Sequence, residues 1–116
     1  MNSQAITVKS TPNGVYIFAL SGVLDVGQDE ELQYSMIECF DAGSYRIILD
    51  FTNAKRIYSP VLRIITWASE IINNNEGRFV LAGISPENFE ILDMIGLEEL
   101  VEMVPDMEFA MELFQE

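Results

Sequence analysis

The residues best suited to signalling chemistry lie in the segment IYSPVL at positions 57–62, between a strand-like pattern and a helix-like pattern. Ser59 offers a hydroxyl group, and Pro60 directly after it is typical of the first turn of a helix. Two interpretations of Ser59 remain open: its oxygen caps the helix by accepting a backbone N–H group, or it accepts a phosphate group in regulation. Tyr58 is either a loop aromatic packed on the strand ends or an exposed anchor for a partner protein.

Catalytic chemistry finds no positive support in the sequence. The chain contains no histidine, which excludes Ser-His-Asp and Cys-His arrangements and histidine metal sites. Neither a GxGxxG motif nor a GxxxxGK[ST] phosphate loop occurs. The 19 acidic residues are scattered over expected solvent faces, without the spacing of a calcium loop. We therefore predict a protein that is not an enzyme and that uses no cofactor or metal ion.

The charge of the chain is strongly negative but unevenly distributed. The net charge of −13 argues against binding to a nucleic-acid backbone. Ten acidic residues and no basic residue lie between positions 87 and 116. Four of the six basic residues lie between positions 46 and 63, where Asp50 alone opposes them: Arg46, Lys55, Arg56 and Arg63. These cations are either a chance grouping or a positive face, near residues 55–63, for an acidic partner or a phosphate group.

The length and composition favour one compact domain over residues 1–116. With 116 residues, of which 49% are hydrophobic, the chain can bury a substantial core. No apolar run reaches the roughly 18 residues that a membrane helix needs, and no signal-peptide pattern opens the sequence. The single Cys39 cannot pair within the chain and falls in an apolar helical pattern. We expect a reduced, cytoplasmic setting, with Cys39 as a small core residue.

Hydrophobic periodicity divides the chain into alternating strands and helices. The expected elements are strands at 5–10 and 14–22, a helix from 29, a strand at 45–51, a helix from Ser59, a strand at 78–83, a helix at 85–96, a short edge strand at 100–104 and a helix at 105–114. This order predicts an α/β domain with a mixed, mostly parallel sheet of four to five strands, an N-terminal antiparallel hairpin and about four helices.

Single residues are expected to fix the ends of the last two helices. Ser85 and Asp106 are the candidate N-caps, because their side-chain oxygens can accept backbone N–H groups of the first turn. In the final helix, the spacing places Phe109, Ala110 and Leu113 on the inward face.

Three stretches of the chain resemble the STAS domain of bacterial anti-sigma factor antagonists. LSGVLD (20–25) is similar to the family pattern L-x-G-x-L-D that follows the second strand. IILDFTNAKRIYSPVL (47–62) resembles V-x-L-D-L-S-x-V-x-x-I-D-S-[ST]-G-L, and LAGISPENFEILDMIGLEELV (81–101) resembles the segment from the fourth strand to the final strand. The stretches occur in the family order, so the resemblance covers about the whole chain.

The resemblance implies a protein that acts by binding other proteins. Members of the family bind anti-sigma factors that have a histidine-kinase-like ATPase fold. In a typical antagonist, this kinase phosphorylates a Ser or Thr at the start of the second helix, and the complex then breaks. A helix N-terminus tolerates a phosphate group because its N–H groups and its dipole face the negative charge.

The sequence departs from the family pattern at the phosphorylated position itself. Tyr58 takes the place of the motif's Asp, Pro60 the place of the phosphorylated Ser or Thr, and Val61 the place of Gly. Three other motif positions match: Ile57, Ser59 and Leu62. Since proline has no hydroxyl group, the resemblance does not carry the usual phosphorylation switch to this chain.

The resulting hypothesis is a regulatory module that binds a kinase-like anti-sigma factor or a related signalling protein, with its usual switch removed. The candidate partner-binding residues are Asp25, Asn53, Arg56, Tyr58, Ser59, Pro60 and Arg63. Asp25 and Asp50 each have a second interpretation as structural carboxylates of a cap or a strand end. Alternatives are an antagonist still phosphorylated at Ser59 and a small STAS subunit of a membrane lipid-transport ABC complex. A homodimer also remains open.

Overall fold

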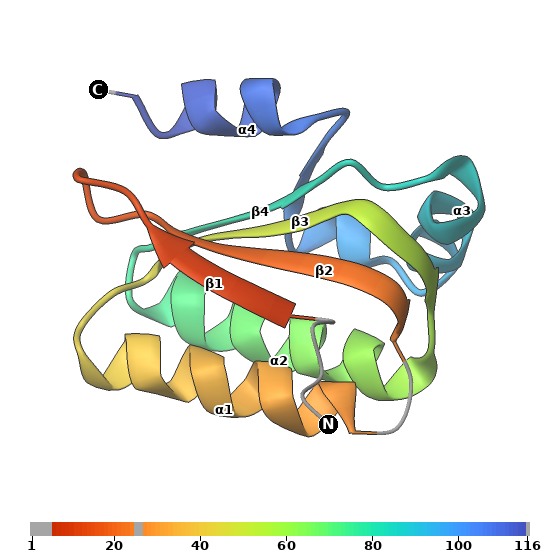
Figure 1. The fold of residues 1–116 in the computed structure, drawn as a ribbon, viewed down its shortest axis with the longest axis horizontal. Coiled ribbons are helices and arrows are strands. Elements are labelled where there is room, and N and C mark those ends of the chain that lie inside the picture. The colour runs from red at the N-terminus through yellow and green to blue at the C-terminus, as the bar shows by residue number, and fades with distance from the viewer. Residues whose placement is uncertain (1–5, 25–26, 116) are drawn as a thin grey trace.

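Figure 1 shows the computed structural model, which describes residues 6–24 and 27–115 around a five-stranded sheet. The strands lie across the sheet in sequence order: β1 (Ile6–Ser10), β2 (Tyr16–Leu24), β3 (Arg46–Ile57), β4 (Arg78–Ala82) and β5 (Glu102–Val104). β1 runs antiparallel to β2, and all the other neighbouring strands are parallel. The predicted α/β class, with its mostly parallel sheet and N-terminal hairpin, is confirmed.

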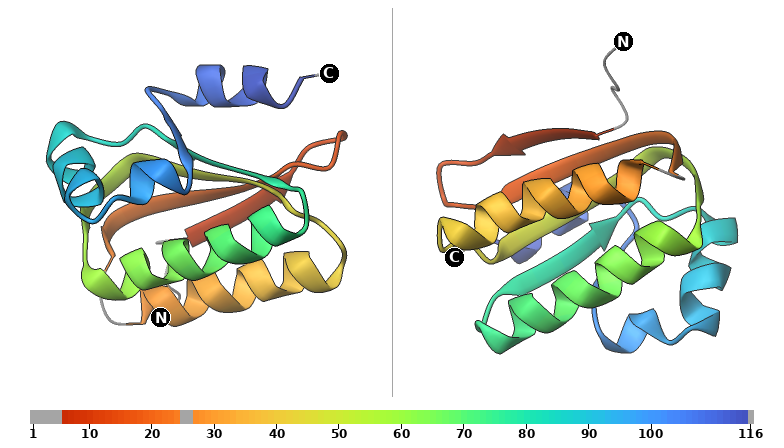
Figure 2. Two further views of the ribbon diagram at one scale, coloured as in Figure 1. Left: turned by 180° about the vertical axis from the view of Figure 1, so that it is seen from behind. Right: turned by 90° about the horizontal axis from the view of Figure 1, so that it is seen from below.

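The helices form two layers that enclose the sheet. Successive parallel strands move in one direction across the sheet, so right-handed crossovers place their helices on one face. α1 (Gln28–Asp41) and α2 (Ser59–Asn74) lie side by side there, and α3 (Pro86–Met94) lies beside the carboxyl ends of the strands (Figures 1 and 2). A 3₁₀ turn, η1 (Leu97–Glu99), leads into β5, and α4 (Met107–Leu113) crosses the opposite face.

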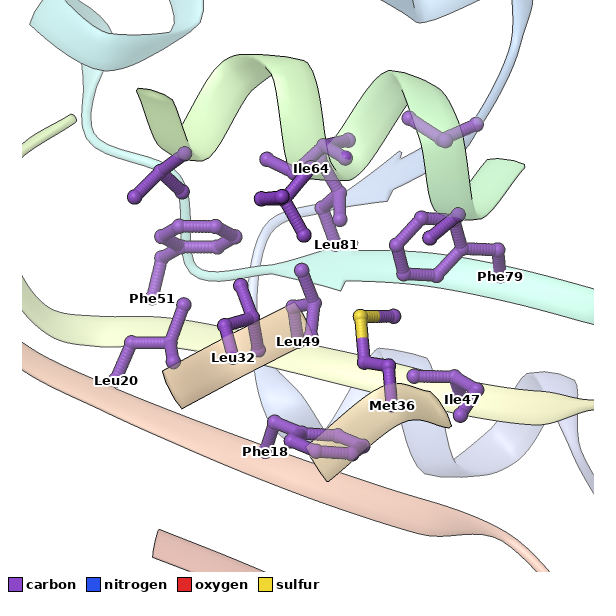
Figure 3. Packing of buried hydrophobic residues seen from close by; sticks show 14 of the residues in the cluster. Phe18, Leu20, Leu32, Met36, Ile47, Leu49, Phe51, Ile64, Phe79 and Leu81 are labelled. Atoms are coloured by element: carbon purple, nitrogen blue, oxygen red, sulfur yellow. The ribbon is translucent and has the colours of Figure 1, made fainter. Parts of the chain in front are cut away.

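The hydrophobic core follows from the burial of β3 on both faces. Successive side chains of a strand point to opposite faces of the sheet. Ile47 and Leu49 therefore belong to the large cluster under α1 and α2, which Figure 3 shows, while Ile48 belongs to the smaller cluster under α4. All three side chains are fully buried. This two-sided burial explains the nearly continuous apolar run in the sequence.

Cys39 lies in the core, as the sequence predicts. It belongs to the cluster that α1 and α2 form with the sheet, and its side chain is buried. Burial raises the pKa of the Cys39 thiol to about 11, and the nearby Glu38 carboxylate adds to the effect. A thiol with a raised pKa is a poor nucleophile, so Cys39 serves packing.

The caps predicted for the last two helices are present. The Ser85 hydroxyl accepts the Asn88 backbone N–H at 3.2 Å, and the Asp106 carboxylate accepts the Phe109 backbone N–H at 2.8 Å. The predicted inward position of Phe109 is wrong, because its side chain is 48% exposed. The short helix α4 turns Ala110 to the sheet, and Phe114 just beyond its end is buried in the same cluster.

Two arginines hold the carboxyl end of α4 on the sheet. Arg46 Nη2 donates to the Phe114 carbonyl at 3.1 Å, and Arg78 Nη1 donates to the Leu113 carbonyl at 2.8 Å. The two guanidinium carbons lie 5.3 and 5.9 Å from the centre of the Phe114 ring. Cations suit this place because the last carbonyls of a helix lack partners within the helix and carry the negative end of its dipole.

The contact with the end of α4 places Arg46 apart from the other basic residues of positions 46–63. Arg46 begins β3, whereas Lys55 and Arg56 lie near the end of that twelve-residue strand. Arg78 also donates to the two carboxylate oxygens of Glu102, from Nε at 2.7 Å and from Nη2 at 2.9 Å. The hydrogen bond from Arg78 lowers the pKa of the Glu102 carboxyl below its usual value. Arg46 therefore does not contribute to the positive face suggested near residues 55–63.

The opposite environments of Phe114 and Phe109 give a matched test of this packing. Phe114→Ala should lower the free energy of unfolding by about 3–5 kcal/mol, because it leaves a cavity between α4 and the sheet. Phe109→Ala, at an exposed position of the same segment, should change it by less than about 0.5 kcal/mol. Urea unfolding followed by circular dichroism measures both. Equal losses for the two variants would contradict the placement of α4.

Candidate functional site

The candidate site is the junction at which β3 ends and α2 begins. Ile57 is the last residue of β3, and Ser59 is the first residue of α2. The side chains of Arg56, Tyr58 and Ser59 are exposed around it. Asn53 is also exposed and lies three residues earlier on β3, opposite Ser21 of β2.

The other candidate residues lie on α2, except for one. Pro60 is half-buried in the first turn of α2, and Arg63 is exposed one turn further along. The seventh candidate, Asp25, lies outside the described residues. Asp50, which the sequence left open between a structural and a site role, lies earlier on β3. One oxygen of its carboxylate accepts the Thr52 backbone N–H at 3.0 Å and the Thr52 hydroxyl at 2.6 Å. Asp50 is thus satisfied within its own strand.

The first turn of α2 forms without a side-chain cap, so the interpretation of Ser59 as a helix cap is wrong. Tyr58 occupies the N-cap position in an extended conformation, with φ −104° and ψ 165°, and Ser59 is already helical. The Tyr58 carbonyl accepts the backbone N–H groups of Val61 at 3.0 Å and Leu62 at 3.3 Å. Pro60 fits the first turn because the N–H group that it lacks has no helical partner there.

This shift by one residue leaves the Ser59 hydroxyl exposed. Within the part of the chain that the structure describes, its side chain makes no hydrogen bond. The sequence expectation failed because Ser followed by Pro suits two registers of the helix start, with Ser either at the N-cap or at the next position. The backbone decides between them, since the Tyr58 N–H donates to the Leu24 carbonyl at 3.4 Å and keeps Tyr58 extended beside β2.

Tyr58 and Arg56 form an exposed pair at the junction. The Arg56 guanidinium carbon lies 5.4 Å from the centre of the Tyr58 ring, within the range of a cation–π contact. The Tyr58 side chain is 40% exposed, which favours the interpretation as a surface residue over a loop aromatic packed on strand ends. Aromatic and arginine side chains are the types that most often dominate the energy of protein interfaces.

The end of β3 extends beyond its neighbour β4 and needs another partner there. β4 stops at Ala82, which lies opposite Asp50, but β3 continues to Ile57. Asn88 of α3 supplies the missing hydrogen bonds. Its Oδ1 accepts the Ile57 backbone N–H, and its Nδ2 donates to the Lys55 carbonyl, both at 3.3 Å. The side-chain amide thus replaces one peptide group of an adjacent strand.

Asn88 is a site residue that the sequence analysis missed. Its side chain is 2% exposed, an unusual burial for a polar residue and one that requires hydrogen-bond partners. A signal was present in the sequence, because Asn88 and the apolar Leu92 stand four residues apart and share one face of the helix. Leu92 is fully buried, so the same face carries Asn88 inward.

A close approach of the backbone supports the same region. The loop after β4 passes Thr52 of β3 at Gly83, where an added Cβ would lie 2.6 Å from the Thr52 hydroxyl oxygen. The backbone of Gly83 is left-handed, with φ +74°, which favours glycine. The chain can therefore turn from β4 toward α3 directly against the strand that carries the junction.

The described residues 6–24 and 27–115 contain no group of three or more His, Cys, Asp or Glu side chains placed to hold a metal ion. In the same ranges, none of the helices has both the length and the apolar character needed to cross a membrane.

The junction offers a cation, an aromatic ring and a hydroxyl group on one surface. This combination suits recognition of another molecule by contact.

Comparison with known proteins matches most of the chain. A family model described as STAS domain matches residues 7–110. BtrV of Bordetella bronchiseptica (strain ATCC BAA-588 / NCTC 13252 / RB50), whose name describes an anti-sigma factor antagonist, is 24% identical over 103 residues, 89% of each chain.

Solved structures of an anti-sigma factor antagonist and of a Bacillus cell fate determinant share the fold. One from Thermotoga maritima has a TM-score of 0.86 at 19% identity, covering 95% of this chain and 94% of that chain. The phosphorylated form of SpoIIAA from Bacillus has a TM-score of 0.79 at 18% identity, covering 96% of this chain and all of that chain (100%).

The role of Asn88 can be tested by removing its amide. Asn88→Ala should lower the free energy of unfolding by about 1–3 kcal/mol, because the buried Ile57 N–H and the partly buried Lys55 carbonyl of β3 lose their partner. Hydrogen exchange at the Ile57 amide should accelerate as well. Asn74→Ala, at an exposed position of α2, is the matched control and should change stability by less than about 0.5 kcal/mol. An Asn88→Ala variant as stable as this control, with the Ile57 amide still protected, would contradict the role.

Proposed function

Because the chain belongs to the STAS domain family, we propose that it is a non-enzymatic regulatory module that binds a kinase-like anti-sigma factor or a related signalling protein. The binding surface is the β3–α2 junction. The observation that carries this proposal is the exposed pair of Arg56 and Tyr58 directly before α2, since these residue types anchor protein interfaces. The name of BtrV, an anti-sigma factor antagonist, supports the same class of partner.

The same junction leads us to propose that the module does not use the usual phosphorylation switch. Pro60 stands where the family motif has its phosphorylated Ser or Thr, and a proline side chain has no oxygen to accept a phosphate group. A partner kinase would then bind without being released by its own reaction. The module would act as a constitutive antagonist, or as a scaffold that holds the kinase in one place.

A second candidate function keeps the switch and moves it to Ser59. This candidate is favoured by the exposed Ser59 hydroxyl, which makes no hydrogen bond within the described residues. A phosphate group there would still lie at the N-terminus of α2, where it is tolerated. Its charge of about −1.5 to −2 would also lie on the same surface as Arg56 and Arg63 and change that surface.

The partner can be identified by affinity capture from the native cell followed by mass spectrometry. We expect a kinase-like anti-sigma factor or related signalling protein to be retained by the unmodified chain. Arg56→Glu combined with Tyr58→Ala should reduce its recovery at least about tenfold, since both anchors of the surface are lost. Lys9→Glu, a charge reversal on edge strand β1, is the control and should leave recovery unchanged. Capture of transporter ATPases alone would contradict the proposal.

The state of the switch can be tested with the purified kinase and ATP, with intact-mass measurement of the chain. We expect no gain of mass for the unmodified chain, because Pro60 offers no acceptor. Pro60→Ser, which restores the hydroxyl group at the family position, should gain one phosphate and lose affinity for the kinase. A stoichiometric phosphate on the unmodified chain that disappears in Ser59→Ala would instead establish the second candidate.

A further inference from the structure

A second feature of the surface lies beside the junction, on the outer side of α2. A hollow of about 430 Å³ opens there, and its walls come from α2 and from the end of α3. The apolar part is formed by Leu62, Trp67 and Ile95, while Arg63 and Glu70 supply charge. Ile95 is 54% exposed, and the neighbouring Met94 is 84% exposed. These apolar side chains are left in water by the fold.

The hollow is lined by one basic and one acidic side chain, which lie at different points along α2. Arg63 and Glu70 both line it and stand seven residues apart on α2, about two helical turns or 10 Å. On the Arg63 side, the hollow includes Ser59 and adjoins the pair of Arg56 and Tyr58, which adds a second positive charge there. One end of the hollow is therefore positive and the other negative, on a chain with a net charge of −13.

The shape and charge of the hollow select among possible occupants. The hollow is broad and open, whereas small-molecule sites enclose most of their ligand. Nucleic acid and an anionic membrane would be repelled by the net charge. A second copy of this chain would bring the same net negative charge. A partner segment with apolar side chains and its own acidic end fits both the apolar walls and the cations.

We propose that this hollow receives an amphipathic helix of the partner protein, with its apolar stripe on Leu62, Trp67 and Ile95 and its acidic end toward Arg63. Helices of this kind bind grooves through apolar side chains spaced by three, four and seven residues. The proposal rests on the proposed function, because the hollow shares Ser59 and Arg63 with the junction and extends the same interface. It adds the chemistry of the partner segment, which the junction alone does not specify.

The chain carries its own reporter for this site, because Trp67 is its single tryptophan. The probe is a synthetic 18-residue peptide with leucine at helical spacing, two glutamates at one end and glutamine at its remaining surface positions. We expect a saturable change in Trp67 fluorescence with this peptide. A scrambled peptide of the same composition, which lacks the apolar stripe, should produce none. The two peptides carry equal charge, so the comparison isolates the helical stripe.

Two variants of the chain test the two parts of the surface. Arg63→Glu should weaken binding of the acidic peptide at least about tenfold by reversing the charge at its end. Ile95→Ser should weaken it by removing apolar contact at an already exposed position. Lys9→Glu is the charge control and should have no effect. The inference is overturned if the scrambled peptide binds equally well, if the acidic peptide does not change Trp67 fluorescence, or if neither variant weakens binding.

The outcomes also separate this inference from the proposed function. If the captured signalling partner binds the Arg63→Glu and Ile95→Ser variants as well as the unmodified chain, the helix site is wrong while the proposed function stands. If the acidic peptide binds as expected but no signalling protein is captured, the proposed function fails alone. A concentration-dependent dimer in analytical ultracentrifugation that Ile95→Ser abolishes would assign the hollow to a second copy and overturn the inference.

Discussion

The structure depends on one constraint: its central strand is longer than the neighbour on one side. β2 pairs with β3 as far as Ile57, but β4 ends opposite Asp50. Unpaired backbone groups in a buried place are costly, so the last residues of β3 need partners from outside the sheet. The buried amide of Asn88 meets this need by contacting both Lys55 and Ile57, and it thereby fixes α3 against the end of the strand.

The geometry of the junction follows from that contact. Because β3 stays extended to Ile57, Tyr58 is held beside β2 through its N–H group, and α2 begins only at Ser59. The helix then takes its first turn from the Tyr58 carbonyl instead of a side-chain oxygen. The surface offered to a partner is thus set by backbone hydrogen bonds. The side chains of Arg56, Tyr58 and Ser59 are consequently available for recognition, since the turn is held by backbone groups and not by these side chains.

The order of the strands and helices could be predicted from the sequence, because burial of one face produces a periodic pattern of apolar residues. β3 residues 47–49 are apolar on both faces, and the caps at Ser85 and Asp106 carry their own side-chain chemistry. Residues 52–56, which are exposed except for the half-buried Ala54, show no such pattern, so the end of β3 was placed too early. The N-cap of α2 was placed at Ser59 instead of Tyr58, and Phe109 was placed inward, because both depend on tertiary contacts. The role of Asn88 was missed because it consists of hydrogen bonds to the end of β3, which is remote from Asn88 in the sequence.

The roles of the basic residues explain why a very acidic chain can still present a positive surface. Arg46 and Arg78 donate hydrogen bonds to the last carbonyl groups of α4, and Arg78 also neutralises Glu102, at one end of the sheet. Lys55, Arg56 and Arg63 remain exposed near the opposite end, where the sequence from 51 to 69 has no acid. The net negative charge repels acidic molecules over most of the surface, so an acidic partner is attracted chiefly to this end. The same field would disfavour approach of such a partner in other orientations, which supports the proposal that the junction is the point of first contact.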